Sequence, residues 1–122
     1  MFNSFYKNKK VLVTGHTGFK GSWLVSWLNK LGADVYGFSK DLLPFPSHFH
    51  LLNLDNKISH MVGDIRDRKL LFEIIEDIKP DLIFHLAAQA IVSTSYSDPL
   101  ETISTNVMGT ANILDCLRMI NY

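Results

Sequence analysis

Three glycines separated by two residues each, Gly15, Gly18 and Gly21, constrain the fold of this chain more than any other feature. They follow a short apolar segment, 11–13, and they open a segment with the apolar periodicity of a helix. Glycine lets the backbone come close to a phosphate, and the N–H groups and dipole at the start of a helix favour negative charge. A strand, a glycine turn and a helix in this order therefore predict a loop that binds the pyrophosphate of a nucleotide.

Short apolar segments recur along the chain and predict four strands. Each is rich in β-branched or aromatic residues and is bounded by glycine or polar residues. The expected strands span Val11–Val13, Val35–Phe38, Ser59–Val62 and Leu82–His85. The long connection after the second strand carries Pro44 and Pro46, and a short helical turn is expected in it near 47–52. A polar loop is expected at 93–95.

Three helices are predicted from apolar residues that repeat every three or four positions. The first ends at Gly32, the second begins near Asp67 and ends at Pro80, and the third begins with Asp98 as its cap and Pro99 at its first position. The expected buried stripes are Leu24, Trp27, Leu28 and Leu31 in the first, Leu70, Leu71, Ile74, Ile75 and Ile78 in the second, and Ile103, Val107, Ala111, Leu114 and Leu117 in the third.

Strands that alternate with helices favour a parallel sheet with right-handed crossovers. The predicted fold class is α/β, namely the N-terminal half of a doubly wound, Rossmann-type sheet with four strands and three helices. We expect one domain over residues 1–122, because the chain shows no linker or repeat and its length suits one moderate core. A complete fold of this kind continues with a fifth strand, so we expect an incomplete domain.

Charge and cysteine content narrow the partners and the compartment. Lys and Arg total 12, Asp and Glu total 12, and the one basic cluster is Lys7, Lys9 and Lys10. This balance argues against nucleic acid and against an anionic membrane, and it favours a small, neutral partner. Cys116 is the only cysteine, so it is expected to pack in a helix in a reducing compartment. Because no apolar run is long enough for a spanning helix or a signal peptide, we expect a cytoplasmic protein.

Four segments carry recognisable patterns: TGHTGFKG at 14–21, GDIRD at 63–67, HLAAQ at 85–89 and NVMGT at 106–110. Together they resemble the extended short-chain dehydrogenase/reductase family. Within that family, GHTGFKGSWL at 15–24 and SYSDP at 95–99 are most similar to the CDP-glucose 4,6-dehydratases. The resemblance covers essentially the whole chain. It implies a dinucleotide cofactor, a nucleotide-sugar substrate, in particular CDP-glucose, and a homodimer.

By matched position, the resemblance also implies the residues of a cofactor site. They are Gly15, His16, Gly18, Phe19 and Gly21 around the pyrophosphate, Ser39 and Lys40 near the adenosine ribose, Asp64 and Ile65 at the adenine, and Leu86, Ala87, Ala88 and Thr105 toward the nicotinamide. Gln89 and Ser95 are implied as substrate contacts. The residues themselves leave plainer roles open, because Asp64 also fits a solvated turn and the two alanines also fit helix packing.

Two positions depart from the pattern of the family. Many relatives carry an acid at the end of the second strand, where it binds the adenosine ribose, but this chain has Ser39 followed by Lys40. The resemblance implies NAD, yet these residues leave NADP open, because only an acid would repel a 2′-phosphate. CDP-glucose dehydratases usually carry an arginine where this chain has Ser93, which puts the identity of the sugar nucleotide in question.

The implied chemistry is an internal redox cycle: the cofactor takes hydride from C4 of the sugar, water leaves from C6, and hydride returns to C6. It needs a Tyr-x-x-x-Lys pair on a helix, where residues four apart lie about 6 Å apart along the axis. The spacing occurs at Tyr6–Lys10, before the first strand, and at Tyr36–Lys40, on a strand. We therefore expect no catalytic residue in this chain. We also expect no metal site, because His48 and His50 lack further ligands at close spacing.

Two other hypotheses stay open. Another enzyme of the same family, a nucleotide-sugar epimerase or reductase, shares the cofactor-binding half, and turnover of CDP-glucose to a 4-keto-6-deoxy product would distinguish it. A binding module that senses dinucleotides without catalysis is the other hypothesis. As a free module the chain would leave its fourth strand as an uncovered apolar edge, which favours aggregation.

Overall fold

The computed structural model describes residues 1–41 and 43–120. The chain separates into two compact units. The first, here called the sheet unit, contains residues 1–63 and 80–86, and the second, the helical unit, contains residues 64–79 and the chain from Ala87 onward. Among the described residues, no helix is both long and apolar enough to cross a bilayer.

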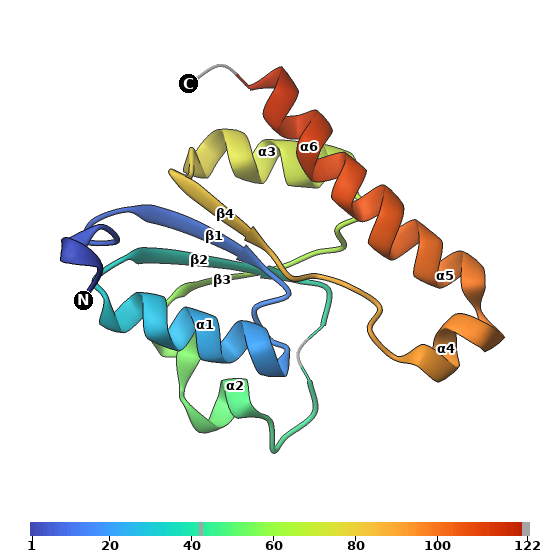
Figure 1. Ribbon diagram of the computed structural model, residues 1–122, viewed down its shortest axis with the longest axis horizontal. Helices are drawn as coiled ribbons and strands as arrows, with labels where there is room; N and C mark the ends of the chain where they lie inside the picture. The colour runs from blue at the N-terminus through green and yellow to red at the C-terminus, as the bar shows by residue number, and fades with distance from the viewer. Residues whose placement is uncertain (42, 121–122) are drawn as a thin grey trace. The chain divides into compact units, whose positions relative to one another are not determined.

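All four predicted strands form, and they pair in one parallel sheet (Figure 1). They are β1 (Lys10–Thr14), β2 (Asp34–Ser39), β3 (Ser59–Val62) and β4 (Leu82–His85), in the spatial order β3-β2-β1-β4. Val11 of β1 lies opposite Val35 of β2 and Leu82 of β4. Parallel neighbours need crossover connections, so this sheet confirms the predicted α/β class. The direction of winding reverses between β1 and β4, which is where open sheets of this kind bind ligands.

Two helices belong to the sheet unit, α1 (Phe19–Lys30) and α2 (His48–Leu51), with 3-10 turns at Phe2–Ser4 and Leu54–Asn56. The short α2 is the helical turn predicted in the long connection, and the Ser47 side chain caps it by accepting a hydrogen bond from the His50 N–H. The core of this unit contains Val11, Val13, Val25, Leu28, Ala33, Val35, Phe49 and Leu54. This core therefore packs β1 and β2 against α1 and α2.

The buried face of α1 differs from the predicted one. Val25 and Leu28 are buried, whereas Trp27 is 49% exposed. The prediction for Leu28 is confirmed, and that for Trp27 is wrong. Large apolar residues lie on both sides of this helix, so the periodicity of the sequence does not say which side faces the sheet.

The helical unit begins with a segment that the sequence predicted well. Asp67 caps α3 (Arg68–Ile78), because its carboxylate accepts a hydrogen bond from the Leu70 N–H at 3.0 Å. Leu71, Ile75 and Ile78 are buried as predicted. The helix ends at Lys79, which adopts a left-handed conformation with φ +51° just before a proline.

The predicted third helix consists of three consecutive segments. Asp98 caps α5 (Pro99–Ile103) as expected, a π-helical turn follows at Ser104–Met108, and α6 (Gly109–Met119) completes it. A further short helix, α4 (Val92–Ser97), precedes them. The prediction of a polar loop at 93–95 is therefore wrong. The serine hydroxyls of this polar helix donate to its own carbonyls, as Ser95 Oγ does to the Val92 carbonyl at 2.6 Å.

The apolar stripe predicted for this last helix is not the buried one. Ile103, Val107, Leu114 and Leu117 are all exposed, and Ala111 is exposed as well. The residues that are buried instead are Gly109, Asn112, Ile113 and Cys116. The helix packs against α3 through this small and partly polar face (Figure 1). The packing role predicted for Cys116 is confirmed, because its side chain is fully buried.

Candidate functional site

The glycine loop connects the end of β1 to the start of α1 and closes on itself. Gly15 has φ +72°, a conformation that favours glycine, and its carbonyl accepts a hydrogen bond from the Gly18 N–H at 3.2 Å. A Cβ atom on Gly21 would overlap the Gly15 carbonyl oxygen. The first turn of the helix thus packs directly on the loop backbone, and only glycine at position 21 allows this approach.

The N-terminus of α1, next to the glycine loop, differs from the N-termini of the capped helices. Among the described residues, no side chain caps this helix, and its N-cap is Gly18. Three other helices do have capping side chains, from Ser47, Asp67 and Asp98. The first N–H groups of a helix need acceptors, and a phosphate at this end would supply them. The structure thus forms the strand, glycine turn and helix that the sequence predicted, and the binding of a pyrophosphate there stays a prediction.

The side chain of His16 points into the protein interior. Its ring is fully buried, with Nε2 2.6 Å from Nδ1 of His60 and Nδ1 3.1 Å from Oγ of Ser39. The ring also packs edge-on against Phe49, and a Cβ atom on Gly37 would overlap it. Burial and, to a smaller extent, the neighbouring His60 together lower the pKa of His16 from 6.5 to about 4. Its predicted place beside a pyrophosphate is not tested by these contacts, which belong to the core.

Ser39, at the end of β2, also faces inward. Its hydroxyl lies 3.4 Å from the Thr17 N–H, which donates to it, and next to His16 as described above. The neighbouring Lys40 is exposed. Of the two residues predicted near an adenosine ribose, only Lys40 therefore presents its side chain to solvent. Sequence reasoning did not detect the His16–Ser39–His60 cluster, because His60 lies on the distant strand β3 and no local pattern marks it.

The carboxyl end of β4 is tied to that of β1. The Leu86 N–H donates to both the carbonyl oxygen and the hydroxyl of Thr14, each at 3.1 Å. The same hydroxyl lies 2.7 Å from Nδ1 of His85, and burial lowers the pKa of this histidine. His85 is therefore a partly buried, hydrogen-bonded residue at the end of β4. The hydrogen bonds to Thr14 also fix the backbone at Leu86, one of the predicted cofactor residues.

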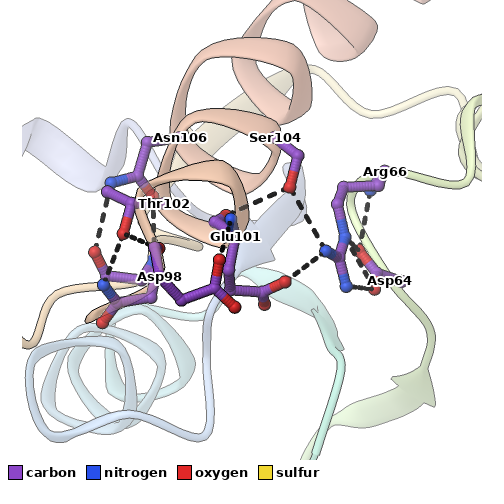
Figure 2. Close-up of polar contacts among 8 residues, drawn as sticks. Asp64, Arg66, Asp98, Glu101, Thr102, Ser104 and Asn106 are labelled. Atoms are coloured by element: carbon purple, nitrogen blue, oxygen red, sulfur yellow. Dashed lines mark hydrogen bonds and ion pairs between the residues drawn. The ribbon is translucent and has the colours of Figure 1, made fainter. Parts of the chain in front are cut away.

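In the helical unit, Arg66 holds two acidic side chains. Its guanidinium forms bidentate contacts with Asp64, with Nε–Oδ1 at 3.0 Å and Nη2–Oδ2 at 2.7 Å, while Nη1 lies 2.6 Å from Oε2 of Glu101 (Figure 2). Ser104 adds an acceptor at 3.3 Å. The hydrogen bonds that Arg66 donates to Asp64 and, with a smaller effect, to Glu101 raise the pKa of Arg66. The carboxylate of Asp64 is thus oriented by Arg66 and remains partly exposed, and its predicted contact with an adenine stays a prediction.

A second polar pair joins the segment after β4 to the π-helical turn. The Gln89 N–H donates to Oδ1 of Asn106 at 2.8 Å, and Nδ2 of Asn106 donates to the Gln89 carbonyl at 3.1 Å. The Gln89 side chain donates to Thr102 at 2.9 Å and accepts from the Ile91 N–H at 2.7 Å. Gln89, which was predicted as a substrate contact, therefore links the segment after β4 to the helical segment that carries Thr102 and Asn106. Figure 2 shows Thr102 and Asn106 on the same helical segment.

The remaining predicted residues of the helical unit differ in exposure. Ile65 is buried and packs on Gly109, whose position has no room for a side chain. Ala87 and Thr105 are partly buried, and Ala88 is exposed. Ser95 is partly buried in α4. Cofactor and substrate roles for these residues stay predictions.

Other candidate chemistry finds little support. Within residues 1–41 and 43–120, no three His, Cys, Asp or Glu side chains are grouped so as to hold a metal ion. Tyr36 lies on β2 and donates its hydroxyl to Asp34 at 2.9 Å, and Tyr6 precedes β1. Neither Tyr-x-x-x-Lys spacing therefore lies on a helix, as the sequence predicted.

Comparison with known proteins places these features in a wider group. A family model described as GDP-mannose 4,6 dehydratase matches residues 12–122. CDP-glucose 4,6-dehydratase of Salmonella typhimurium is 46% identical over 117 residues, which cover 96% of this chain and 33% of that protein. GDP-mannose 4,6-dehydratase of Vibrio cholerae is 33% identical and covers 92% of this chain and 32% of that protein. The chain therefore spans about a third of the length of these relatives.

Solved structures agree with the sequence comparison. UDP-glucose 4-epimerase from Brucella ovis, in complex with NAD, superimposes with a TM-score of 0.78 at 31% identity. The match covers 91% of this chain and 32% of that structure. The parallel sheet and its helices thus correspond to part of a nucleotide-sugar enzyme whose crystal structure contains NAD.

Proposed function

The chain belongs to the GDP-mannose 4,6 dehydratase family, and from this membership we propose that it forms the cofactor-binding part of a nucleotide-sugar 4,6-dehydratase that acts on CDP-glucose. The observation that carries the proposal is the uncapped helix α1 behind the glycine loop. A phosphate there satisfies helix N–H groups that three other helices satisfy with their own side chains. The rest of the site follows by family position.

The proposed cofactor is NAD. Gly15, Gly18, Phe19 and Gly21 hold the pyrophosphate, with His16 supporting the loop from behind. Asp64 and Ile65 meet the adenine, and the clamp by Arg66 presents the Asp64 carboxylate in a fixed orientation. Bound NAD would supply a reversible hydride acceptor, and the protein residues named here bind and orient it.

The choice between NAD and NADP depends on the end of β2. The buried Ser39 hydroxyl is engaged with His16 and Thr17, which leaves Lys40 as the exposed group at that end. A lysine there tolerates a 2′-phosphate, so NADP is the alternative cofactor. Calorimetric titration with each dinucleotide tests this choice directly. If NADP binds at least as tightly as NAD, the proposal that NAD is the cofactor is wrong.

CDP-glucose is proposed as the substrate because the relative named for it is 46% identical, compared with 33% for a relative named for GDP-mannose. Because no catalytic residue is expected in this chain, the test uses the whole protein to which it belongs, incubated with CDP-glucose and NAD and followed by mass spectrometry of the sugar nucleotide. Loss of water from CDP-glucose, without net reduction of NAD, supports the proposal. Loss of water from GDP-mannose alone would assign a different substrate.

A nucleotide-sugar epimerase is the second candidate, and the superposition on UDP-glucose 4-epimerase favours it. An epimerase inverts one carbon of the sugar without changing its mass. The same assay therefore distinguishes the two candidates, because an epimerised product keeps its mass but changes its retention in chromatography.

We further propose that the protein is a homodimer, formed through the exposed apolar side of α5 and α6.

A further inference from the structure

Helix α1 carries a row of exposed aromatic residues on the side opposite the core. Phe19, Trp23 and Trp27 follow each other at intervals of four residues, so they lie along one side of the helix. Their exposed fractions are 69%, 55% and 49%. Exposed rings of this size in a continuous row mark an interaction surface.

Aromatic neighbours extend this row beyond the helix. The ring of His48 lies 4.3 Å from that of Trp23, and the ring of Phe2 lies 5.7 Å from that of Trp27. Phe2 is itself half exposed. We call the surface made by Phe2, Phe19, Trp23 and Trp27 the aromatic face. A hollow on it is lined by Trp23, Leu24, Ser26, Trp27 and Lys30, an apolar lining with one cation at its edge.

Helix α1, which supplies Phe19, Trp23 and Trp27, carries positive charge only. Its sequence contains two lysines and no Asp or Glu, while exposed acids lie on other elements of the sheet unit, at Asp34 and Asp55. Lys20 and Lys30 lie on α1 itself and are exposed. Helix α1 therefore has a net positive charge within a chain whose formal charges balance.

We propose that the aromatic face is a peripheral docking surface for a membrane containing anionic phospholipid. Tryptophan and phenylalanine settle at the boundary between headgroups and acyl chains, and nearby lysines are attracted to anionic headgroups. The outer side of a helix is convex, which suits a deformable bilayer better than the groove-filling contact of a peptide.

A second copy of this chain is the main competing occupant, and the charges disfavour it. In a symmetric contact each α1 would meet its copy, which would bring Lys20 and Lys30 near the same lysines of the second chain with no acid on the helix to compensate. An anionic bilayer has the complementary charge instead. The proposal goes beyond the dehydratase function and does not depend on it.

The two tryptophans of this sequence both lie on the aromatic face, which gives a direct probe. The purified protein is mixed with vesicles of phosphatidylglycerol or of phosphatidylcholine, and tryptophan emission and co-sedimentation are recorded at low and high salt. We expect a blue shift of the emission and sedimentation with phosphatidylglycerol only, both weakened by salt. Lipids brominated on the acyl chain should quench the emission, because the rings enter the interface.

Variants separate docking from misfolding. Lys30→Glu should weaken binding to phosphatidylglycerol by about fivefold or more, the effect of one charge near an anionic surface. Trp23→Gln combined with Trp27→Gln should abolish sedimentation. The control combines Leu51→Gln with Lys69→Glu, which removes one exposed apolar side chain and one exposed lysine outside the aromatic face and should bind like the wild type. Far-ultraviolet circular dichroism checks that each variant is folded.

Three outcomes would overturn the proposal. The first is no emission shift and no sedimentation with phosphatidylglycerol at low salt. The second is equal binding by Lys30→Glu and the wild type. The third is a self-associated protein that ignores vesicles and becomes smaller in the double tryptophan variant, which would assign the face to a second copy.

Discussion

His16 sits in the loop expected to bind a dinucleotide, yet its ring belongs to the core. Its pKa is lowered to about 4 by burial and by His60, so the folded protein resists protonation that the unfolded chain accepts near pH 6.5. The free energy of unfolding is therefore highest above pH 6.5 and falls as the pH drops toward 4, by about 3 kcal/mol in total.

Urea denaturation at pH 7 and at pH 5 measures this effect. The wild type should lose stability at pH 5, and His16→Gln should lose less, because one of the buried histidines is gone. An identical loss in both proteins would mean that His16 does not couple protonation to folding.

Gly21 is the position in the loop that tolerates a side chain least. In Gly21→Ala the new methyl group would overlap the Gly15 carbonyl, so the loop and the start of α1 must separate. We expect dinucleotide binding to fall below detection and the free energy of unfolding to fall by about 1–3 kcal/mol. Calorimetric titration and urea denaturation check both effects. Ser26→Ala, on the outer side of the same helix, is the control and should retain binding.

At the scale of elements, the uncapped end of α1 separates binding from folding. Gly18 has φ −66° and ψ 169°, which any residue can adopt, and a Cβ there meets the Gly15 carbonyl oxygen at 3.3 Å. Gly18→Asp would cap the helix and repel a phosphate, so we expect weaker dinucleotide binding with a stability change below about 1 kcal/mol. Gly18→Asn is the control, because asparagine has the shape of aspartate without its charge. If both variants bind equally, the electrostatic argument for this helix end is wrong.

Helix α6 is fastened to the segment before α3 by one buried amide. Nδ2 of Asn112 donates to the carbonyls of Ile65 and Arg66 at 3.1 and 3.2 Å. In Asn112→Ala both carbonyls lose this donor, and we expect a loss of about 1–3 kcal/mol in the free energy of unfolding. Thermal and urea denaturation measure it, with the exposed Glu76→Ala as the control. A loss no larger than that of the control would show that water replaces the amide.

At the scale of the whole molecule, the exposed apolar side of α6 predicts self-association. Leu114 and Leu117 are 63% and 39% exposed. Neighbouring leucines that face water are unfavourable, and a second subunit would bury them. Light scattering should show a dimer for the wild type and a monomer for Leu114→Gln combined with Leu117→Gln. Leu51→Gln on α2 is the control and should remain dimeric. A wild type that is monomeric at micromolar concentration would contradict the proposed homodimer.

Much of this fold was predictable because its signals are local. The glycine spacing, the capping residues Asp67 and Asp98, and the apolar runs of the four strands each depend on neighbouring residues alone, and all of them appear in the structure. The buried face of α3 was predictable too, because its apolar residues lie on one side. The same reasoning failed for α1 and α6, whose apolar residues lie on two sides.

The sequence by itself determined the class of fold, the order of the strands and main helices, and the place of the glycine loop, since these follow from periodicity and backbone chemistry within short segments. Only the tertiary structure decided that His16 turns inward to meet His60, that Arg66 clamps Asp64 and Glu101, and that Trp23 and Trp27 face outward. Such choices depend on which distant side chain fills a given space, because packing and charge pairing act between residues that the chain brings together only on folding.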